Sequence, residues 1–87
     1  MSSYQIVVAS RAKRDLKKIN QVQLTRLDEA ILKLEETPYP HGVKRLIAAD
    51  VAQYRIRVGD YRILYDVDEK NKTVIILRVG HRKEIYR

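Results

Sequence analysis

Hydrophobic and polar side chains alternate most clearly between Ala52 and Asp66, in the stretch AQYRIRVGDYRILYD. Alternation with a period of two predicts two short β-strands joined by a two-residue turn at Gly59 and Asp60, since glycine supplies the positive φ that such a turn requires. The turn sets the register of the two strands. The expected cross-strand pairs are Tyr54 with Tyr65, Arg55 with Leu64, Ile56 with Ile63, Arg57 with Arg62, and Val58 with Tyr61.

In this register one face of the hairpin is apolar and the other carries Arg55, Arg57 and Arg62. Like charges directly opposite each other destabilise a strand pair, so placing Arg57 across from Arg62 favours an anion-binding role for this face. A second interpretation stays open, because exposed strands often carry arginine and lysine to stay soluble and to discourage edge pairing.

The first forty residues predict one strand followed by two helices. Tyr4–Val8 is rich in β-branched residues, which favours a strand. Ser10 is a suitable N-cap for the helix that follows, and Asn20 is a natural stop for it. A second helix is expected from about residue 22 to residue 37, directly before a proline that disfavours a helical predecessor. The apolar stripes of the two helices are Ala12, Leu16 and Ile19 on the first, and Leu24, Leu27, Ile31 and Leu34 on the second.

The residues after the hairpin predict a turn at 69–72 and a last strand at Thr73–Val79. That strand is apolar at nearly every position, which is typical of a central strand. The element order is therefore β-α-α-β-β-β. It describes an α+β fold in which a small, mostly antiparallel sheet has both N-terminal helices packed on one face. We expect the helices to cover the apolar hairpin face and to leave the arginine face open.

A C-terminal tail that folds back over the open face would bring His81, Arg82 and Tyr86 towards the three arginines. This set of cations, one imidazole and one phenol holds no carboxylate base and no nucleophile. It suits a phosphodiester whose own 2′-hydroxyl attacks the adjacent phosphorus, because positioned charges stabilise that transition state. RNA is a substrate of this kind.

Composition limits the class of protein further. The 87 residues are expected to form one domain, 1–87, with 45% hydrophobic and 33% charged residues. No apolar run approaches the roughly 20 residues of a membrane span, so we expect a cytoplasmic protein without membrane contact. No cysteine and two separated histidines predict neither a metal nor another cofactor. A net charge of +7 favours nucleic acid as a partner, with an acidic protein as the second possibility.

Two segments together, QYRIRVGDYRILYDVD and VIILRVGHRKEIY, resemble the RelE/ParE superfamily of bacterial toxins, and specifically its RelE branch. The resemblance covers essentially the whole chain. It implies a RelE-like fold and a metal-independent endoribonuclease that cleaves mRNA in the A site of the ribosome. It also implies a cognate RelB-like antitoxin as a partner, with DNA contacted only indirectly through that antitoxin.

Carried over by position, the resemblance assigns functional roles to Arg55, Arg57, Arg62, Arg82 and Tyr86. A well-known family member has lysine at the two second-strand positions, where this chain has Arg55 and Arg57. Arginine binds phosphate well but is a poor proton donor or acceptor at neutral pH, so the proton carrier is open. His81 is a candidate acid or base, since imidazole ionises near neutral pH. A ParE-like inhibitor of DNA gyrase and a non-catalytic RNA-binding module are the alternative functions.

Overall fold

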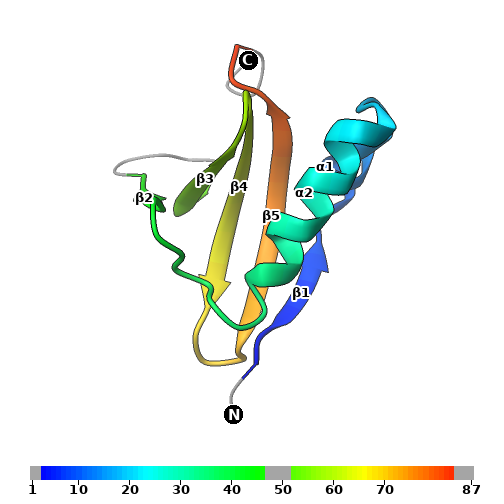
Figure 1. Ribbon diagram of the computed structural model, residues 1–87. Coiled ribbons are helices and arrows are strands. Elements are labelled where there is room, and N and C mark those ends of the chain that lie inside the picture. The colour runs from blue at the N-terminus through cyan, green and yellow to red at the C-terminus, as the bar shows by residue number, and fades with distance from the viewer. Residues whose placement is uncertain (1–2, 47–51, 84–87) are drawn as a thin grey trace.

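The computed structural model describes residues 3–46 and 52–83, which form two helices and a five-stranded sheet (Figure 1). The sheet has the strand order β1-β5-β4-β3-β2. The elements in chain order are β1 (Gln5–Val8), α1 (Ser10–Lys17), α2 (Gln21–Lys33), β2 (Lys44–Arg45), β3 (Tyr54–Val58), β4 (Tyr61–Asp68) and β5 (Thr73–His81).

The sheet confirms the expected α+β architecture and adds one strand to it. β1 pairs with β5 in parallel, and every other neighbouring pair is antiparallel, so the sheet is mixed. β5 lies between β1 and β4, which agrees with the central position that its apolar sequence predicted. The added strand is β2, whose two residues extend the sheet beyond β3 and carry too short a pattern to reveal a strand.

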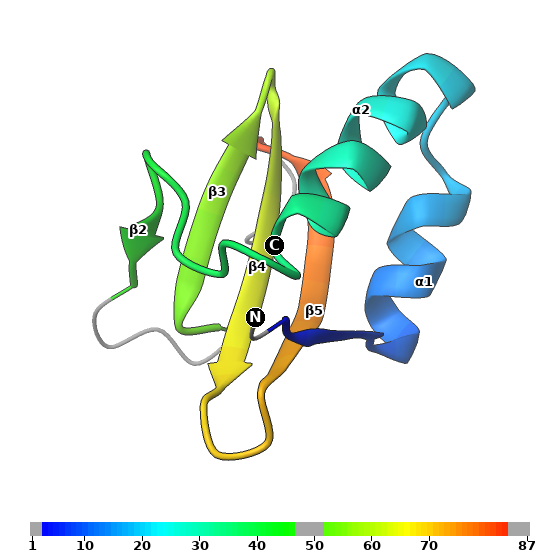
Figure 2. The same cartoon turned by 60° about the horizontal axis from the view of Figure 1, so that its bottom comes forward.

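Both helices lie on one side of the sheet (Figure 2), and both contribute side chains to the core there. Side chains from α1 and α2 pack against alternate residues of β3, β4 and β5, including Ile56 and Ile63. The buried members of this main core are Ala12, Leu27, Ile31, Leu34, Ile56, Ile63, Tyr65, Val74, Ile76 and Val79.

The helix ends differ in part from the expectation. Ala9 rather than Ser10 stands at the N-cap of α1, and no side chain caps that end. Asn20 separates the helices by capping the second one, since its Oδ1 accepts a hydrogen bond from the Gln23 backbone N–H at 3.0 Å. α2 ends at Lys33, four residues before the expected limit, because the chain tightens into a turn whose N–H groups bond three residues back.

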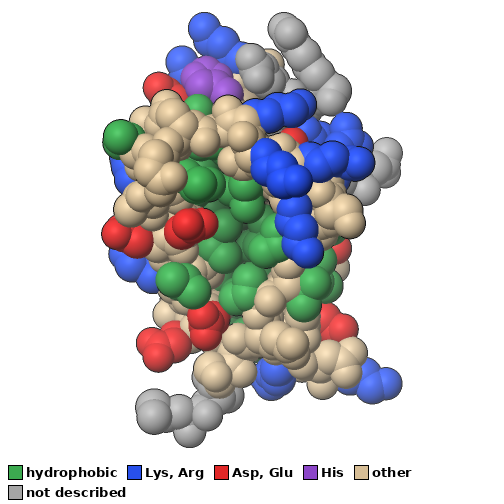
Figure 3. Space-filling model, turned by 90° about the vertical axis from the view of Figure 1, so that its right-hand side faces the viewer, with side chains coloured by type: hydrophobic (Ala, Val, Ile, Leu, Met, Phe, Trp, Pro, Cys, Tyr) green, Lys and Arg blue, Asp and Glu red, His purple; other side chains and the backbone are tan. Residues whose placement is uncertain are grey.

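The helix-bearing side of the molecule is uneven in charge. Figure 3 shows hydrophobic side chains exposed in its middle, with lysine and arginine gathered on one side and acidic side chains on the other. α1 supplies a basic segment, SRAKRDLK, that contains one acidic residue. That residue, Asp15, is bound by Arg78 of β5 through a salt bridge at 2.8 Å between Nε and Oδ2. No helix within residues 3–46 and 52–83 is long and apolar enough to cross a membrane.

Candidate functional site

The β3–β4 hairpin places the arginines in the expected register. Arg57 stands opposite Arg62 and Arg55 opposite Leu64, so these residues share the face away from the main core. Gly59 begins the turn with a φ of +62°, a conformation that side chains with a Cβ rarely adopt. The guanidinium of Arg26, from α2, lies 3.4 Å from where a Cβ on Gly59 would stand. The tip of the hairpin is thus defined by a backbone requirement and by a contact with α2.

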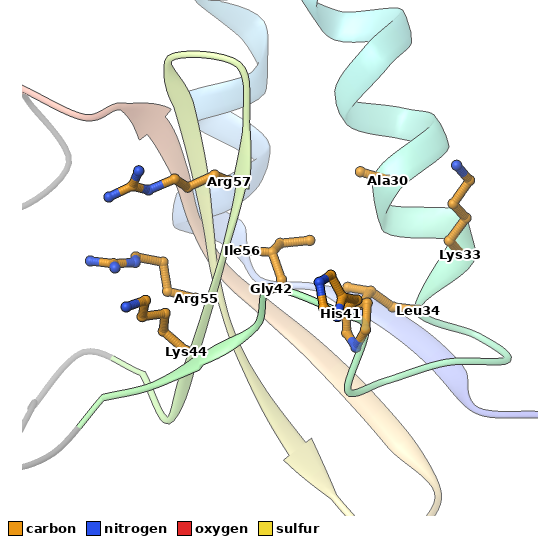
Figure 4. Close-up of a pocket in the computed structure, with 10 residues that line it drawn as sticks. Ala30, Lys33, Leu34, His41, Gly42, Lys44, Arg55, Ile56 and Arg57 are labelled. Atoms are coloured by element: carbon orange, nitrogen blue, oxygen red, sulfur yellow. The ribbon is translucent and has the colours of Figure 1, made fainter.

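Lys44 is a fourth cation on this face, and the sequence alone did not reveal it. It stands directly opposite Arg55 on the added strand β2. Figure 4 shows its side chain pointing to the same side as Arg55 and Arg57, away from α2, whereas Ile56 points towards α2. We call Lys44, Arg55, Arg57 and Arg62 the cationic face.

Only part of the sheet face opposite the main core is open. Leu64, two residues after Arg62, is completely buried in a second apolar cluster rather than exposed beside the arginines. The register of β4 and β5 shifts between Leu64 and Tyr65, and Leu77 at this irregularity packs into the same cluster. The cluster consists of Leu46, Ala52, Leu64 and Leu77. The cationic face therefore ends where this cluster begins, and the expectation of a wholly open face was wrong.

The end of β5 brings Arg82 close to the hairpin tip. Gly80 stands opposite Arg62 and has no side chain to cover it. Two residues later the backbone N–H of Arg82 donates to the carbonyl oxygen of Asp60 at 2.9 Å. This hydrogen bond ties the chain after β5 to the turn between β3 and β4. Tyr86, the last of the expected site residues, lies outside the described residues.

His81 does not join the cationic face, contrary to the expected convergence. It pairs with Tyr61, whose side chain packs against the main core, and the two rings meet edge to face with centroids 5.8 Å apart. The His81 Nδ1 accepts a hydrogen bond from the Lys83 backbone N–H at 3.2 Å. Since alternate residues of a strand point to opposite faces, the neighbour of Gly80 must lie on the other side from Arg62.

A cavity of about 560 Å³ lies at the edge of β3, between that strand and the C-terminal half of α2 (Figure 4). Its apolar lining comes from Ala30, Leu34 and Ile56, while Lys33 and Lys44 contribute charge at opposite sides. The cavity adjoins the cationic face through Arg55 and Arg57. An amphipathic, acidic segment would match both the apolar lining and the charged border.

Two carboxylates, those of Asp66 and Asp15, accept hydrogen bonds that hold them in place. Asp66 shares a strand with Arg62, and its Oδ1 accepts from the Gln53 backbone N–H at 2.7 Å. On α1, burial alone would raise the pKa of Asp15, but hydrogen bonds from Arg78 and the Val79 backbone N–H outweigh it and hold that pKa below its ordinary value. Within the described ranges, no cluster of three or more metal-ligating side chains occurs.

The comparisons with known proteins agree with this fold. A family model described as the ParE toxin of the type II toxin-antitoxin system parDE matches residues 6–86. Toxin RelG of Mycobacterium tuberculosis is 38% identical over 85 residues, which cover 97% of each chain. The chain therefore belongs to the RelE/ParE superfamily of type II toxins, in its RelE branch.

Solved structures of related complexes lead to the same family. One chain of the toxin-antitoxin complex RelBE2 from Mycobacterium tuberculosis matches with a TM-score of 0.81 at 33% identity, covering 92% of this chain and 99% of that one. The archaeal RelE-RelB complex from Pyrococcus horikoshii OT3 matches with a TM-score of 0.80 at 28% identity, covering 97% and 99%. Both are complexes of a toxin with its antitoxin.

Proposed function

We propose that this toxin is a ribosome-dependent endoribonuclease that cleaves mRNA in the A site through attack of a ribose 2′-hydroxyl on the adjacent phosphorus. The observation that carries the proposal is the pair of Arg57 and Arg62, directly opposite each other on a sheet face that the helices do not cover. Two like charges in this position weaken the strand pair unless an anion lies between them. A phosphodiester is such an anion, and guanidinium groups bind its oxygens in a bidentate manner.

In this mechanism the arginines stabilise the charge that develops on the phosphorane oxygens. Arg55, Arg57 and Arg62 hold the scissile phosphate, and Arg82 approaches it from the chain that follows β5. Tyr86 stacks on a base and fixes the in-line geometry of the attack. Each positioned donor of this kind contributes on the order of 10²–10³ in rate. The reaction uses no divalent metal as a catalyst.

His81 is tested separately, because it lies beside Tyr61 and away from the cationic face. As a proton carrier it would have to reach the substrate from the other side of the sheet. His81→Ala should therefore slow cleavage by less than tenfold. A loss of rate as large as that in Arg57→Ala would show that His81 takes part in the reaction.

The natural partner in this proposal is a RelB-like antitoxin, and the site of action is the cytoplasm. The relatives described above were solved together with RelB proteins. An acidic or amphipathic antitoxin segment that covers the cationic face would exclude mRNA by occupying the same charges. A complex in which the antitoxin leaves Arg57 and Arg62 accessible, and in which cleavage persists, would contradict this mode of inhibition.

Inhibition of DNA gyrase is the second candidate function, since the matching family model is described as a ParE toxin. Gyrase supercoiling assays with the purified toxin separate it from mRNA cleavage. We expect no inhibition at toxin concentrations that cleave mRNA on translating ribosomes.

Mapping of mRNA 5′ ends in cells during brief toxin expression tests the proposed function. Cuts confined to translated reading frames are expected, because the A site presents only codons under translation. Cuts in untranslated RNA would favour a ribosome-independent nuclease, and the absence of cuts together with inhibited gyrase would favour the second candidate.

A further inference from the structure

The cationic face, as an arginine cluster alone, could bind a phosphodiester but could not move a proton. Guanidinium groups remain protonated well above neutral pH. Cleavage by a 2′-hydroxyl requires a proton for the departing 5′-oxygen, because an alkoxide is a poor leaving group. Three of the four residues of the face, Arg55, Arg57 and Arg62, are arginines.

Lys44 is the exception on this face. Lysine carries an ammonium group whose ordinary pKa is about 10.4, which lets it donate a proton far more readily than a guanidinium can. From the geometry of the sheet we infer that Lys44 donates the proton to the 5′-oxygen of the leaving nucleotide. This inference rests on the proposed function and adds to it a residue that the sequence did not single out.

The position of Lys44 fits this role. It stands directly opposite Arg55 in an antiparallel pair, and residues so placed have Cβ atoms about 4.5–5.5 Å apart. Diagonal neighbours such as Arg57 are about 7–8 Å away. Its flexible four-carbon stem points to the same side as both arginines in Figure 4. The scissile phosphate that Arg55, Arg57 and Arg62 hold lies over β3, between β4 and β2, so the Lys44 ammonium group reaches it from the β2 side.

Other proton donors nearby fit less well. His41 lines the same cavity, but its side chain lies beside Leu34 on the α2 side of β3, away from Arg55 and Arg57 (Figure 4). His81 packs against Tyr61 on the helix-bearing side of the sheet. Asp66 lies on β4 four residues beyond Arg62, roughly 13 Å along the strand, and accepts a hydrogen bond from Gln53. Lys33 comes from α2 and lies across the cavity from Lys44 (Figure 4).

The proposed step balances as follows. The 2′-oxygen forms a bond to phosphorus and its proton passes to water. The bond from phosphorus to the 5′-oxygen breaks, and that oxygen takes a proton from the Lys44 ammonium. The products are a 2′,3′-cyclic phosphate and a 5′-hydroxyl, and the neutral amine regains its proton from solvent.

Two substrates and three variants test the inference on programmed ribosomes under single-turnover conditions. One mRNA carries the natural 5′-oxygen at the scissile position, and the other carries a bridging 5′-sulfur, which leaves without needing a proton. Lys44→Arg keeps the charge but removes a usable proton, and Lys44→Ala removes both. Lys33→Ala is the matched control, because it removes one ammonium from the opposite side of the same cavity.

We expect Lys44→Arg and Lys44→Ala to slow cleavage of the oxygen substrate by about 10²-fold or more, and that of the sulfur substrate by less than tenfold. Lys33→Ala should cleave both at nearly the wild-type rate. A Lys44→Arg variant with wild-type activity, or equal losses on both substrates, would overturn the role of Lys44 while leaving the proposed function intact. Wild-type protein that leaves both mRNAs uncut would overturn the proposed function, and the role of Lys44 with it.

Discussion

Ile63 and Arg57 lie on opposite faces of the same hairpin, so substituting each by alanine tests the assignment of the two faces. Ile63 is completely buried and stands between Ile56 on β3 and Val79 on β5. Ile63→Ala removes three carbon atoms, worth about 2.4 kcal/mol at roughly 0.8 kcal/mol for each buried methylene. The cavity left among its neighbours adds to this, which gives a total loss of about 2–5 kcal/mol.

Arg57 is exposed, and its replacement by alanine relieves repulsion with Arg62. We expect Arg57→Ala to change the free energy of unfolding by less than about 0.5 kcal/mol, or to raise it slightly. Urea unfolding followed by circular dichroism measures the free energy of unfolding of both variants. In thermal unfolding, the Tm of Ile63→Ala should fall by at least about 8 °C. If Arg57→Ala lost as much stability as Ile63→Ala, the assignment of core and open faces would be reversed.

Three further variants test contacts elsewhere. Tyr65→Phe should lower the free energy of unfolding by about 1–2 kcal/mol in urea titrations, because it removes the buried hydrogen bond from the Tyr65 hydroxyl to the Pro38 carbonyl; an unchanged midpoint would contradict that hydrogen bond. The lowered pKa of Asp15 stabilises the fold above about pH 4, and this contribution is lost as the pH falls through the lowered pKa, so Asp15→Asn should be destabilising at pH 7 and progressively less so as the pH falls below 4. A difference that stays constant as the pH falls from 7 into the acid range would show that Asp15 is not linked to folding. Gly59→Ala should cost about 1 kcal/mol or more of stability, since φ at this turn is +62°; an unaffected Tm would contradict the turn.

The hairpin was predictable in detail because two local signals agreed. A two-residue turn beginning with Gly59 allows one register, and the alternation on either side gives each strand one buried face. The same reasoning identified the central strand β5 and the helix stripes that form the main core. In each case a periodic pattern several residues long reported directly on burial.

Features that depend on distant contacts were not predictable. β2 has two residues, and Lys44 belongs to the cationic face only because the chain returns to β3. The burial of Leu64 depends on Leu46 and Leu77, from other parts of the chain. His81 was expected beside the arginines because it follows the last strand, but β5 extends through it, and strand geometry turns it to the other face.

The chemistry of the cleaved ends on ribosome-bound mRNA tests the central claim most directly. Purified toxin should yield a 2′,3′-cyclic phosphate and a 5′-hydroxyl. Cleavage should be undiminished when cobalt hexammine replaces the divalent metal ion in the assay, because the proposed reaction uses no divalent metal as a catalyst. The double variant Arg57→Ala/Arg62→Ala should remain folded and lose nearly all activity, since each donor contributes on the order of 10²–10³ in rate. A product that ends in a 3′-hydroxyl, or cleavage that persists in the double variant, would contradict a mechanism in which this arginine pair stabilises attack by the 2′-hydroxyl.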